Sequence, residues 1–328
     1  MKIYGLMRPE KIYKDVIRQR EIDGITFFNM YNNDFINAGC PACGSKGKLF
    51  FKKYGFKHKL CEKCRTIFCS PRPSEELLNI FYNQFESLKM WTRLLLATDT
   101  ERKMLQYEPR VNKIISIIKR NKGKKGGIAI DIGAGSGAFS MCLKKTDFFT
   151  KIIALDLSED CIKVCRKNGL DAVCGSIWDL EDNSADLICI NDLIEHLYDP
   201  LSFLKKCYRV LGDGGNISIA TPNGEGFDFK IFKSDTDNVT PPEHLNYFNC
   251  FSIDLLLARA GFKTVCLETP GKLDVEIVLN KKNKGYLISK KNEYIDFLLE
   301  QNEETLDNFQ KFLSWNKLSS HMLVVGKK

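Results

Sequence analysis

Apolar and polar residues alternate along the second half of this 328-residue chain in blocks that predict strands and helices in turn. Short apolar runs lie at 127–131, 152–155, 185–191 and 262–267. Such runs are typical of buried strands, because both faces of a central parallel strand are covered. Segments with helical spacing lie between or beside them, at 138–145 and 253–259. The alternation predicts an α/β fold with a doubly wound parallel sheet.

The regions on either side of the alternating part have other patterns. Residues 1–37 show no clear period, and their aromatic residues indicate packing on a larger body. Ser74 with Glu76 has the pattern of a helix start, and apolar residues then recur at helical spacing as far as 118. The basic, glycine-rich run 119–127 is the expected boundary before the sheet. Near the other end, helical spacing at 294–299 and 306–313 precedes a last strand at 319–325.

These patterns divide the chain into four parts. The parts are an N-terminal segment that packs on the core (1–37), a cysteine-rich ribbon (38–72), a helical linker or lid (73–125) and the sheet-forming domain (126–328), which carries an insertion at about 269–318. An apolar content of 44% is enough for a sizeable core. The length and composition therefore fit a protein of several parts.

Three alternating glycines follow the first predicted strand. The strand ends in an acid and runs directly into them: Asp131, Gly133, Gly135 and Gly137. Glycine lets the backbone turn sharply while a ligand lies against it, and the following helix would direct its N-terminal amides to that ligand. The second strand ends in Asp156, an acid suited to hold two ribose hydroxyls. A nucleoside-containing cofactor is expected, and a hydride carrier or a methyl donor would both fit.

The glycine spacing separates these two cofactors. A dinucleotide site has the spacing G-x-G-x-x-G, whereas this chain has G-x-G-x-G led by Asp131. The pattern resembles motif I of class I S-adenosylmethionine (SAM) methyltransferases. Further segments resemble that family's motifs in the same order, at 175–180, 185–191, 195–200, 211–215 and 220–223. The resemblance implies a seven-stranded Rossmann-like sheet whose last strand is antiparallel.

The resemblance also implies a role for each residue beside the cofactor. Asp131 would lie near the cationic end, Asp156 would accept hydrogen bonds from the ribose, and Asn191 would contact the methionine part. The complete set of implied cofactor-binding residues is Asp131, Gly133, Gly135, Gly137, Asp156, Leu157, Ser176, Ile177 and Asn191. SAM carries an activated methyl group, so the protein mainly has to place it in line with a nucleophile.

Two C-x-x-C pairs stand upstream, Cys40 with Cys43 and Cys61 with Cys64, and they enclose seventeen residues. This spacing fits a tetrahedral zinc site with four thiolates. Disulfides or redox dithiols are the alternative. However, the first residues lack the apolar core of a signal peptide and no run approaches the length of a membrane span, so a reducing cytoplasm is expected. Cys69 lies close enough to serve as an alternative ligand.

The charge of the chain is concentrated in the ribbon. The net charge is only +8, but between Lys46 and Arg72 nine basic residues face one acid, Glu62. Such an excess could bind phosphate groups of RNA or of a nucleotide-linked substrate. More often a lysine-rich ribbon is simply solvated.

A hydroxyl acceptor has to lose its proton, which near neutral pH calls for a general base or a metal ion. The chain has four histidines. His58 lies in the ribbon and His321 begins the last strand, which makes both poor candidates. His196 follows the fourth strand and His244 follows the fifth, at the edge where ligands bind in such sheets. His244 is the first choice as base or acceptor-positioning residue, and His196 and Glu195 are the other candidate catalytic residues.

A metal-assisted mechanism is a second possibility. Asp192, Glu195 and His196, with His244 downstream, resemble the E-x-x-E-H plus histidine pattern by which some ubiquinone-biosynthesis and small-RNA 2′-hydroxyl methyltransferases hold a divalent ion. Oxygen and imidazole ligands could polarise an alkoxide. Asp192 stands where those families carry Glu, and Glu-His also occurs here in relatives that bind no metal, so both mechanisms stay open.

With the ribbon included, the chain is similar to zinc-ribbon methyltransferases often encoded with bacterial surface-polysaccharide genes. The likeness is carried by Cys40-Pro-Ala-Cys43-Gly44, the second cysteine pair, Pro71-Arg-Pro-Ser-Glu-Glu76 and Pro242-Glu-His244. It implies a hydroxyl of a sugar, nucleotide-sugar or polysaccharide precursor as the acceptor. Two other hypotheses remain: an RNA methyltransferase that grips phosphates with the ribbon, and a non-catalytic SAM- or partner-binding module, against which the intact glycine turn and Asp156 argue.

Overall fold

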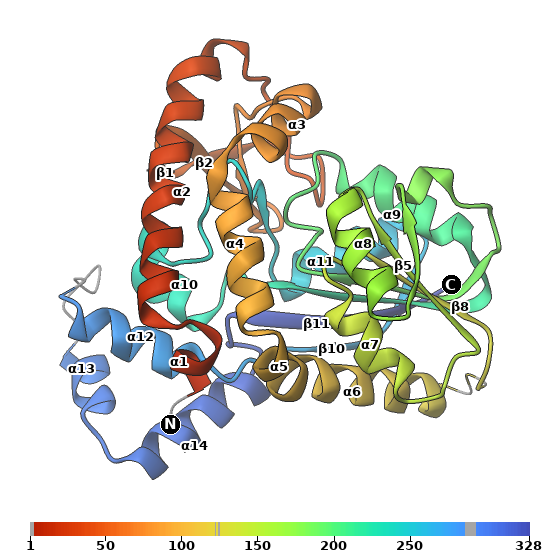
Figure 1. Cartoon of the computed structure of the whole chain (residues 1–328). Coiled ribbons are helices and arrows are strands. Elements are labelled where there is room, and N and C mark those ends of the chain that lie inside the picture. The colour runs from red at the N-terminus through yellow and green to blue at the C-terminus, as the bar shows by residue number, and fades with distance from the viewer. Residues whose placement is uncertain (1–2, 122, 124, 286–292) are drawn as a thin grey trace.

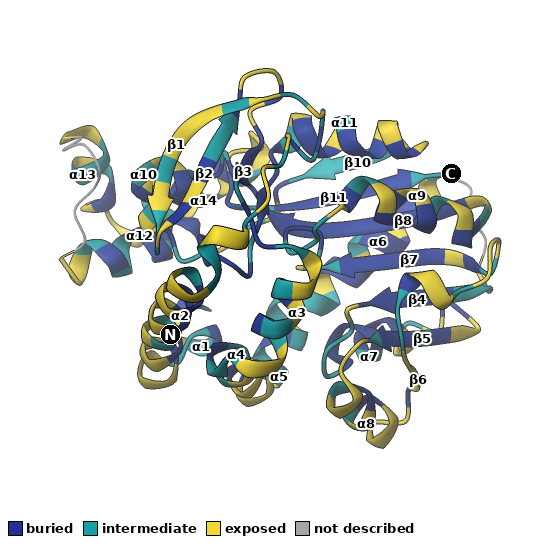
Figure 2. Cartoon of the chain, turned by 90° about the horizontal axis from the view of Figure 1, so that it is seen from above, coloured by how far each residue is buried: buried dark blue, intermediate teal, exposed yellow. Residues whose placement is uncertain are grey.

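The computed structural model describes residues 3–121, 123, 125–285 and 293–328. Its main feature is a seven-stranded sheet in the order β10-β11-β8-β7-β4-β5-β6 (Figures 1 and 2). In chain order the strands are β4 (Ile128–Ile132), β5 (Lys151–Asp156), β6 (Asp171–Cys174), β7 (Ala185–Asn191), β8 (Leu211–Pro222), β10 (Lys263–Glu268) and β11 (His321–Lys327). The strands β4 to β8 run parallel, whereas β11 is antiparallel to both β8 and β10. The predicted doubly wound sheet and its antiparallel last strand are confirmed.

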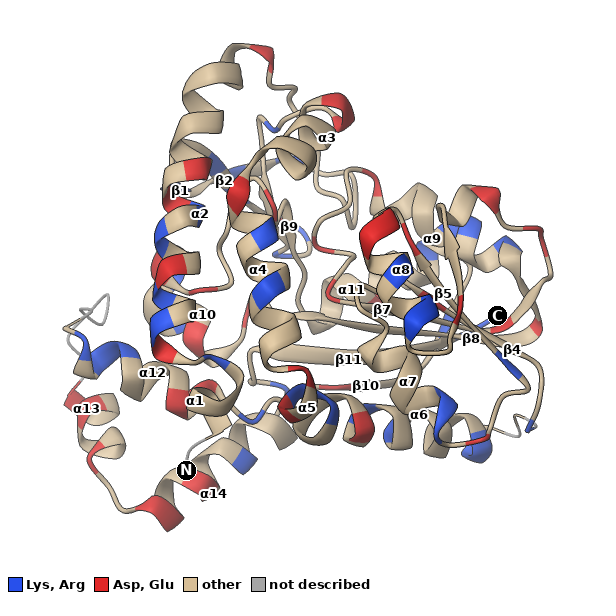
Figure 3. Cartoon of the chain, in the orientation of Figure 1, with Lys and Arg blue, Asp and Glu red and all other residues tan. Residues whose placement is uncertain are grey.

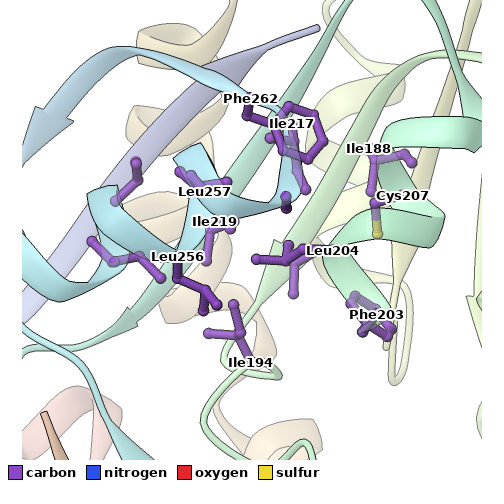
Figure 4. Close-up of a cluster of buried hydrophobic side chains, with 14 of the residues drawn as sticks. Ile188, Ile194, Phe203, Leu204, Cys207, Ile217, Ile219, Leu256, Leu257 and Phe262 are labelled. Carbon is purple, nitrogen blue, oxygen red and sulfur yellow. The ribbon is translucent and has the colours of Figure 1, made fainter. Parts of the chain in front are cut away.

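Helices cover both faces of this sheet, which explains why its central strands β4, β7 and β8 are largely buried. One face carries α9 (Pro200–Val210) and α11 (Cys250–Ala260), the other carries α6 (Glu108–Arg120) and α7 (Ala138–Lys144), and α8 (Glu159–Lys167) packs beside β5 and β6. Figure 4 shows the first face, where Ile219 of β8 lies among Leu204 of α9 and Leu256 of α11. All three side chains are fully buried. At about 2 kcal/mol for each such side chain, this layer contributes much of the stability of the sheet.

A second, four-stranded sheet joins the cysteine ribbon to the main domain. Its strands are β1 (Gly47–Lys53), β2 (Phe56–Cys61), β3 (Ile67–Cys69) and β9 (Asn246–Tyr247), paired in that order. The strand β9 comes from the segment after β8, and in it Tyr247 pairs with Ile67. A two-residue strand has no period, so the sequence does not predict it. Through β9, the ribbon and the segment that carries His244 are parts of one sheet.

The N-terminal segment contains two helices, α1 (Ile3–Met7) and the 22-residue α2 (Glu10–Tyr31), and a short turn, η1 (Asn32–Asp34). The sequence shows no period here because α2 packs on different neighbours along its length. Phe27 lies in an aromatic cluster with Phe81 of the helical linker. Two helical turns earlier, Arg20 forms a buried ion pair with Glu243, with 2.8 Å between Nη2 and Oε2. The helix α2 therefore helps to hold Glu243, the residue before His244, in position.

The linker is helical, as predicted. It consists of α3 (Glu75–Gln84), α4 (Glu86–Ala97), α5 (Asp99–Arg102) and a π-helical turn, η2 (Lys103–Tyr107), that leads into α6. Ser74 caps α3, because its side chain accepts a hydrogen bond from the amide of Leu77. The helices α2 and α4 lie side by side (Figure 1). Arg20 of α2 lies near the edge of the main sheet at which β4 and β7 end, because its charge acts on His196.

The segment between β10 and β11 holds three helices, α12 (Asp274–Asn283), α13 (Glu293–Leu299) and α14 (Glu303–Trp315). The sequence predicts the last two but not α12. The insertion packs on the main domain through Phe309, whose ring meets Phe227 of the short helix α10 (Phe227–Phe232) edge to face. A turn, η4 (Lys233–Asp235), follows α10. Within the described ranges, no helix has both the length and the apolar character needed to cross a bilayer.

Candidate cofactor and acceptor site

The turn between β4 and α7 adopts a conformation that favours glycine at three positions. The φ angles of Gly133, Gly135 and Gly137 are +72°, +54° and +79°, in the left-handed region. A side chain at Gly133 would approach Leu193 to 3.2 Å, whereas nothing lies within 4 Å of one built at Gly135. The turn therefore borders open space at its centre. This is the shape that a ligand lying against the backbone requires.

The ends of β5 and β6 flank this turn. The carboxylate of Asp156 accepts hydrogen bonds from the amides of Gly135 and Ser158, each at 2.8 Å. The next residue, Leu157, leaves 76% of its surface exposed. Ser176 caps the short helix η3 (Ile177–Asp179), and Ile177 is buried beneath it. An acid and an apolar side chain thus stand together beside the open space.

Asp131 lies at the bottom of the turn and is 1% exposed. It accepts hydrogen bonds from the hydroxyl of Ser140 at 2.7 Å and from the amide of Asn191 at 3.4 Å. Burial raises the pKa of Asp131 to about 6, although both hydrogen bonds act in the opposite direction. The predicted cofactor residues of β4 and β7 are therefore in contact.

Arg110, which the sequence does not predict as a site residue, contacts Asn191 beside Asp131. Arg110 of α6 is 8% exposed, and its Nη1 donates to the side-chain oxygen of Asn191 at 2.7 Å. Among the described residues it has no carboxylate partner, which is uncommon for a buried guanidinium. Arg110 is one of four basic residues on α6, so its residue type gives no sequence signal of the direction in which it points. The structure directs it to the edge where β4 and β7 end.

The three candidate catalytic residues also meet at this edge. Glu195, His196 and His244 each offer one ligand atom within 4.8 Å of the others. Glu195 is 1% exposed, its Oε2 accepts from Thr221 at 2.9 Å, and its Oε1 has no hydrogen-bond partner within the described chain. Burial, together with the nearby charge of Asp192, raises the pKa of Glu195 well above its usual value. These three side chains could take a proton from an acceptor hydroxyl or hold a metal ion.

The two imidazoles of this group are neutral near pH 7. Burial lowers the pKa of His196 to about 4 and that of His244 well below its usual range, and the charge of Arg20 acts in the same direction. Nδ1 of His244 donates to the carbonyl oxygen of Asn238 at 2.7 Å, so Nε2 carries the lone pair. The rings of His196 and His244 meet edge to face with centroids 4.5 Å apart. His244 can therefore accept a hydrogen bond from a hydroxyl.

Asp192 lies outside this three-residue group. Its backbone is in the left-handed region, with φ +49°, and its Oδ1 lies 2.7 Å from Nε2 of His321. From sequence, Asp192 is a possible metal ligand, and His321 is a poor candidate because it begins the last strand. The structure instead pairs the two side chains. The antiparallel register of β11 against β8 brings His321 to the same edge.

The four ribbon cysteines form a second group. Their Sγ atoms approach one another closely, with 3.4 Å between Cys40 and Cys64 and the same distance between Cys43 and Cys61. Three of the four are buried. Cys69 is not in the group; its thiol donates to the carbonyl oxygen of Pro71, and burial raises its pKa to about 12. Four converging sulfurs are the donor set of structural zinc sites.

Comparisons with known proteins agree with this arrangement. A sequence model of the methyltransferase domain family matches residues 105–267. A probable SAM-dependent methyltransferase of Mycolicibacterium smegmatis is 29% identical over 142 residues, which cover 42% of this chain and 52% of the relative. A ubiquinone biosynthesis O-methyltransferase of Xanthomonas oryzae is 28% identical over 107 residues, which cover 30% of this chain and 44% of that relative. The chain thus spans about half the length of these curated relatives.

Among solved structures, the chain is similar to a SAM-dependent methyltransferase, possible histamine N-methyltransferase, of Thermotoga maritima. It is 18% identical, covers 76% of this chain and 98% of its own, and aligns with a TM-score of 0.48. The strand order of the main sheet and the glycine turn fit the family match over residues 105–267. Residues 105–267 are thus similar in sequence to methyltransferase domains.

Proposed function

We propose that the chain transfers a methyl group from SAM to a hydroxyl of a sugar, nucleotide-sugar or polysaccharide precursor. One observation carries the proposal: the open glycine turn with Asp156 beside it lies along the same sheet edge as Glu195, His196 and His244. A donor site and a group of acidic and imidazole side chains therefore share one edge. Such an edge is where ligands bind in open α/β sheets.

On the donor side, each residue offers a contact of distinct chemistry. Asp156 would accept from the ribose hydroxyls, and the exposed Leu157 would cover one face of the adenine. Arg110, a buried cation with no carboxylate partner in the described ranges, would pair with the carboxylate of the methionine part. Asp131 would stabilise the cationic end of the cofactor. SAM itself supplies an activated methyl group.

On the acceptor side, His244 would accept a hydrogen bond from the acceptor hydroxyl at Nε2, as a base or as the residue that positions that hydroxyl. His196 stands next to it, and its Nδ1 lies 3.2 Å from the hydroxyl of Tyr82. In a metal-assisted form of the reaction, Glu195, His196 and His244 would be the ligands. The hydroxyl acceptor is supported by the resemblance to zinc-ribbon methyltransferases and by the O-methyltransferase name of one relative.

The proposal includes a structural zinc ion at Cys40, Cys43, Cys61 and Cys64. The ribbon that it would hold is bonded to the acceptor side of the site. The amide of Cys69 donates to the carbonyl oxygen of Leu245, and the side chain of Asn249 donates to that of Cys64. Zinc would thus fix the position of the segment around His244 without taking part in chemistry.

An RNA methyltransferase is the alternative that a specific observation favours. Lys46, Lys48, Lys52, Lys57, Lys63 and Arg65 are exposed on the ribbon. Elsewhere, charges of both signs mix on the visible helices, as on α2 and α8 in Figure 3. Two of the six, however, are paired with acids, Lys48 with Glu62 and Arg65 with Glu225. The remaining excess of positive charge on the ribbon is modest for a phosphate-binding surface. We therefore place the saccharide acceptor before RNA.

The experiment that tests the proposed function follows a labelled methyl group. The purified chain is incubated with methyl-labelled SAM and with cell fractions divided into small molecules, polysaccharide, lipid and RNA. Label in the small-molecule or polysaccharide fraction is expected. Label in RNA, together with binding that falls steeply with salt, would replace the saccharide acceptor by RNA.

Replacing His244 with glutamine is expected to lower turnover about tenfold while the affinity for SAM stays the same. Glutamine can still hydrogen-bond but presents its oxygen in a different place. Turnover is measured with the labelled acceptor fraction and affinity by calorimetry. Wild-type turnover in this variant would remove His244 from the acceptor site.

Lowering the pH from 7 to 5 is expected to weaken SAM binding about tenfold, because the carboxyl of Asp131 must be ionised to face a cation. Its pKa is about 6 without ligand, so it is mostly protonated at pH 5. A bound sulfonium favours the ionised form. Affinity should therefore rise as the pH rises through 6 and level off above it, which calorimetric titrations at several pH values can follow.

S-adenosylhomocysteine is the matched control for this pH dependence, because it lacks the positive charge on sulfur. Its affinity is expected to change less between pH 5 and pH 7. An equal change for both ligands would show that Asp131 does not sense the sulfonium.

A further inference from the structure

The pair of Asp192 and His321 is not used by the proposed function. Asp192 follows β7, and His321 begins β11 opposite Pro222, the last residue of β8. The two side chains are 2.7 Å apart and remain open to solvent, with 43% of Asp192 and 26% of His321 exposed. Glu195, by contrast, is 1% exposed. The pair is therefore the more accessible acid–imidazole arrangement at this edge.

The hydrogen bond fixes which nitrogen of His321 can take a proton. An ionised carboxylate only accepts hydrogen bonds, so Nε2 of His321 donates to Asp192. In the neutral ring the lone pair is then on Nδ1, which has no hydrogen-bond partner within the described part of the chain. An aspartate that holds one imidazole nitrogen while the other receives a proton is the arrangement of a hydrolase triad.

The charges around the pair keep Asp192 ionised. Partial removal of its carboxyl from water raises the pKa of Asp192, but the contact with His321, including its hydrogen bond, and the charge of Arg110 lower it, so that it lies below its usual value. Arg102 of α5 and Tyr107 of η2 also face this carboxyl, and Glu195 lies on its other side. An ionised Asp192 can stabilise an imidazolium at His321.

The pair also lies beside the donor site. Asp192 directly follows Asn191, whose amide donates to Asp131 at the bottom of the glycine turn. One residue further, Leu193 packs against Gly133. The amide of Asp192 donates to the carbonyl oxygen of Ala220 in β8, which fixes this segment over the sheet edge. The segment that carries the carboxylate thus borders the turn expected to hold the donor.

We propose that His321, oriented by Asp192, is the general base of the methyl transfer, and that His244 positions the acceptor hydroxyl. The inference rests on the proposed function. The acceptor O–H bond breaks and its proton passes to Nδ1 of His321. The oxygen lone pair forms the bond to the methyl carbon, and the electron pair of the methyl–sulfur bond stays on sulfur, which leaves as a neutral thioether. The imidazolium facing Asp192 then releases the proton to solvent.

A chemical footprint tests the position of His321 without knowledge of the acceptor. Diethyl pyrocarbonate acylates accessible, unprotonated imidazole nitrogens, and peptide mass spectrometry of the full chain reports each histidine. His321 is expected to react, and sinefungin at ten times its Kd, which carries an amine in place of the methyl group, is expected to slow this reaction about tenfold. His58, which is fully buried, is the internal control.

Two outcomes of the footprint would overturn the inference. Unchanged reactivity of His321 while calorimetry shows saturation by sinefungin would place His321 away from the methyl group, and the proposed function would stand. Absence of any sinefungin binding would overturn the proposed function and this inference with it.

Variants then test its role, with the acceptor from the labelling experiment. His321→Asn is expected to lower turnover about 100-fold and Asp192→Asn about tenfold, with the SAM affinity within twofold of wild type. Asp147→Asn is the matched control. Like Asp192, Asp147 has a left-handed backbone, with φ +51°, and it forms an ion pair with an exposed basic residue, Lys125, near the start of β5. Turnover of His321→Asn within twofold of wild type would contradict the inference, as would an equal loss in the control.

Discussion

Replacing Asp156 with alanine is expected to weaken SAM binding about 1,000-fold. Hydrogen bonds to a charged group stabilise by about 2 kcal/mol each, and the ribose would lose two of them, which corresponds to about three decades in Kd. The loss has a second cause, because the carboxylate also holds the amides of Gly135 and Ser158 at 2.8 Å. Without this carboxylate, the glycine turn loses the hydrogen bond that holds Gly135 in place. Calorimetric titration with SAM measures the change.

The control for this prediction is Asp160→Ala in the first turn of α8. Asp160 is almost fully exposed and, among the residues that the structure describes, its one ion-pair partner is Lys163, so its removal should leave both SAM affinity and the unfolding midpoint unchanged. A Kd for Asp156→Ala within fivefold of wild type would contradict the assignment of the ribose site. A lower affinity caused by general unfolding would appear as a lower midpoint in thermal melts.

Removing zinc is expected to unfold the ribbon. Zinc binds four-thiolate sites with about 10–16 kcal/mol of apparent free energy, which is comparable with the stability of a whole domain. Cys61→Ser should lower the zinc content from one ion per chain to less than one tenth. Because β9 pairs with β3, and Asn249 bonds the carbonyl of Cys64, the segment around His244 should lose its support. Turnover should therefore fall far more than SAM affinity.

The matched control for the zinc prediction is Cys174→Ser, since Cys174 is exposed and lies outside the ribbon. Elemental analysis and protease sensitivity of the ribbon report the result. A wild-type chain that binds no zinc, or a Cys61→Ser variant with an unchanged ribbon and unchanged turnover, would show that the four sulfurs serve another purpose.

The sequence predicted the parts of the fold in which local pattern and tertiary environment agree. The strand at 185–191 has its predicted limits, and the last strand is shifted by two residues, from 319–325 to His321–Lys327. The glycine turn can be predicted because its left-handed backbone conformation costs little energy only for glycine. The three glycines therefore indicate the turn directly. The cysteine group was predicted for a similar reason, since ligand spacing is local within each pair.

Other features depend on contacts between residues far apart in the chain. The helix α2 has no simple apolar stripe, because it buries Phe27 in one cluster and Arg20 against Glu243 in another place. The strand β9 exists only because the ribbon offers β3 as a partner. Arg110 and His321 reach the sheet edge through the packing of α6 and the register of β11, which no local pattern encodes.

The candidate site is consequently built from every part of the chain. The main sheet provides the glycine turn and Asp156, the helical linker provides Arg110 and Tyr82, and the ribbon supports the segment around His244. The N-terminal helix braces Glu243 through Arg20. Changes in the ribbon or in α2 are therefore expected to act on the acceptor side first, while the donor side keeps its own local support.

A crystal structure of the chain with S-adenosylhomocysteine tests most directly whether the donor and the acceptor meet at this sheet edge. The ligand is expected to lie along the glycine turn, with its ribose hydroxyls on Asp156 and its carboxylate near Arg110. Its sulfur should then face the group of Glu195, His196 and His244. A ligand bound elsewhere, or one whose sulfur points away from that group, would contradict the account.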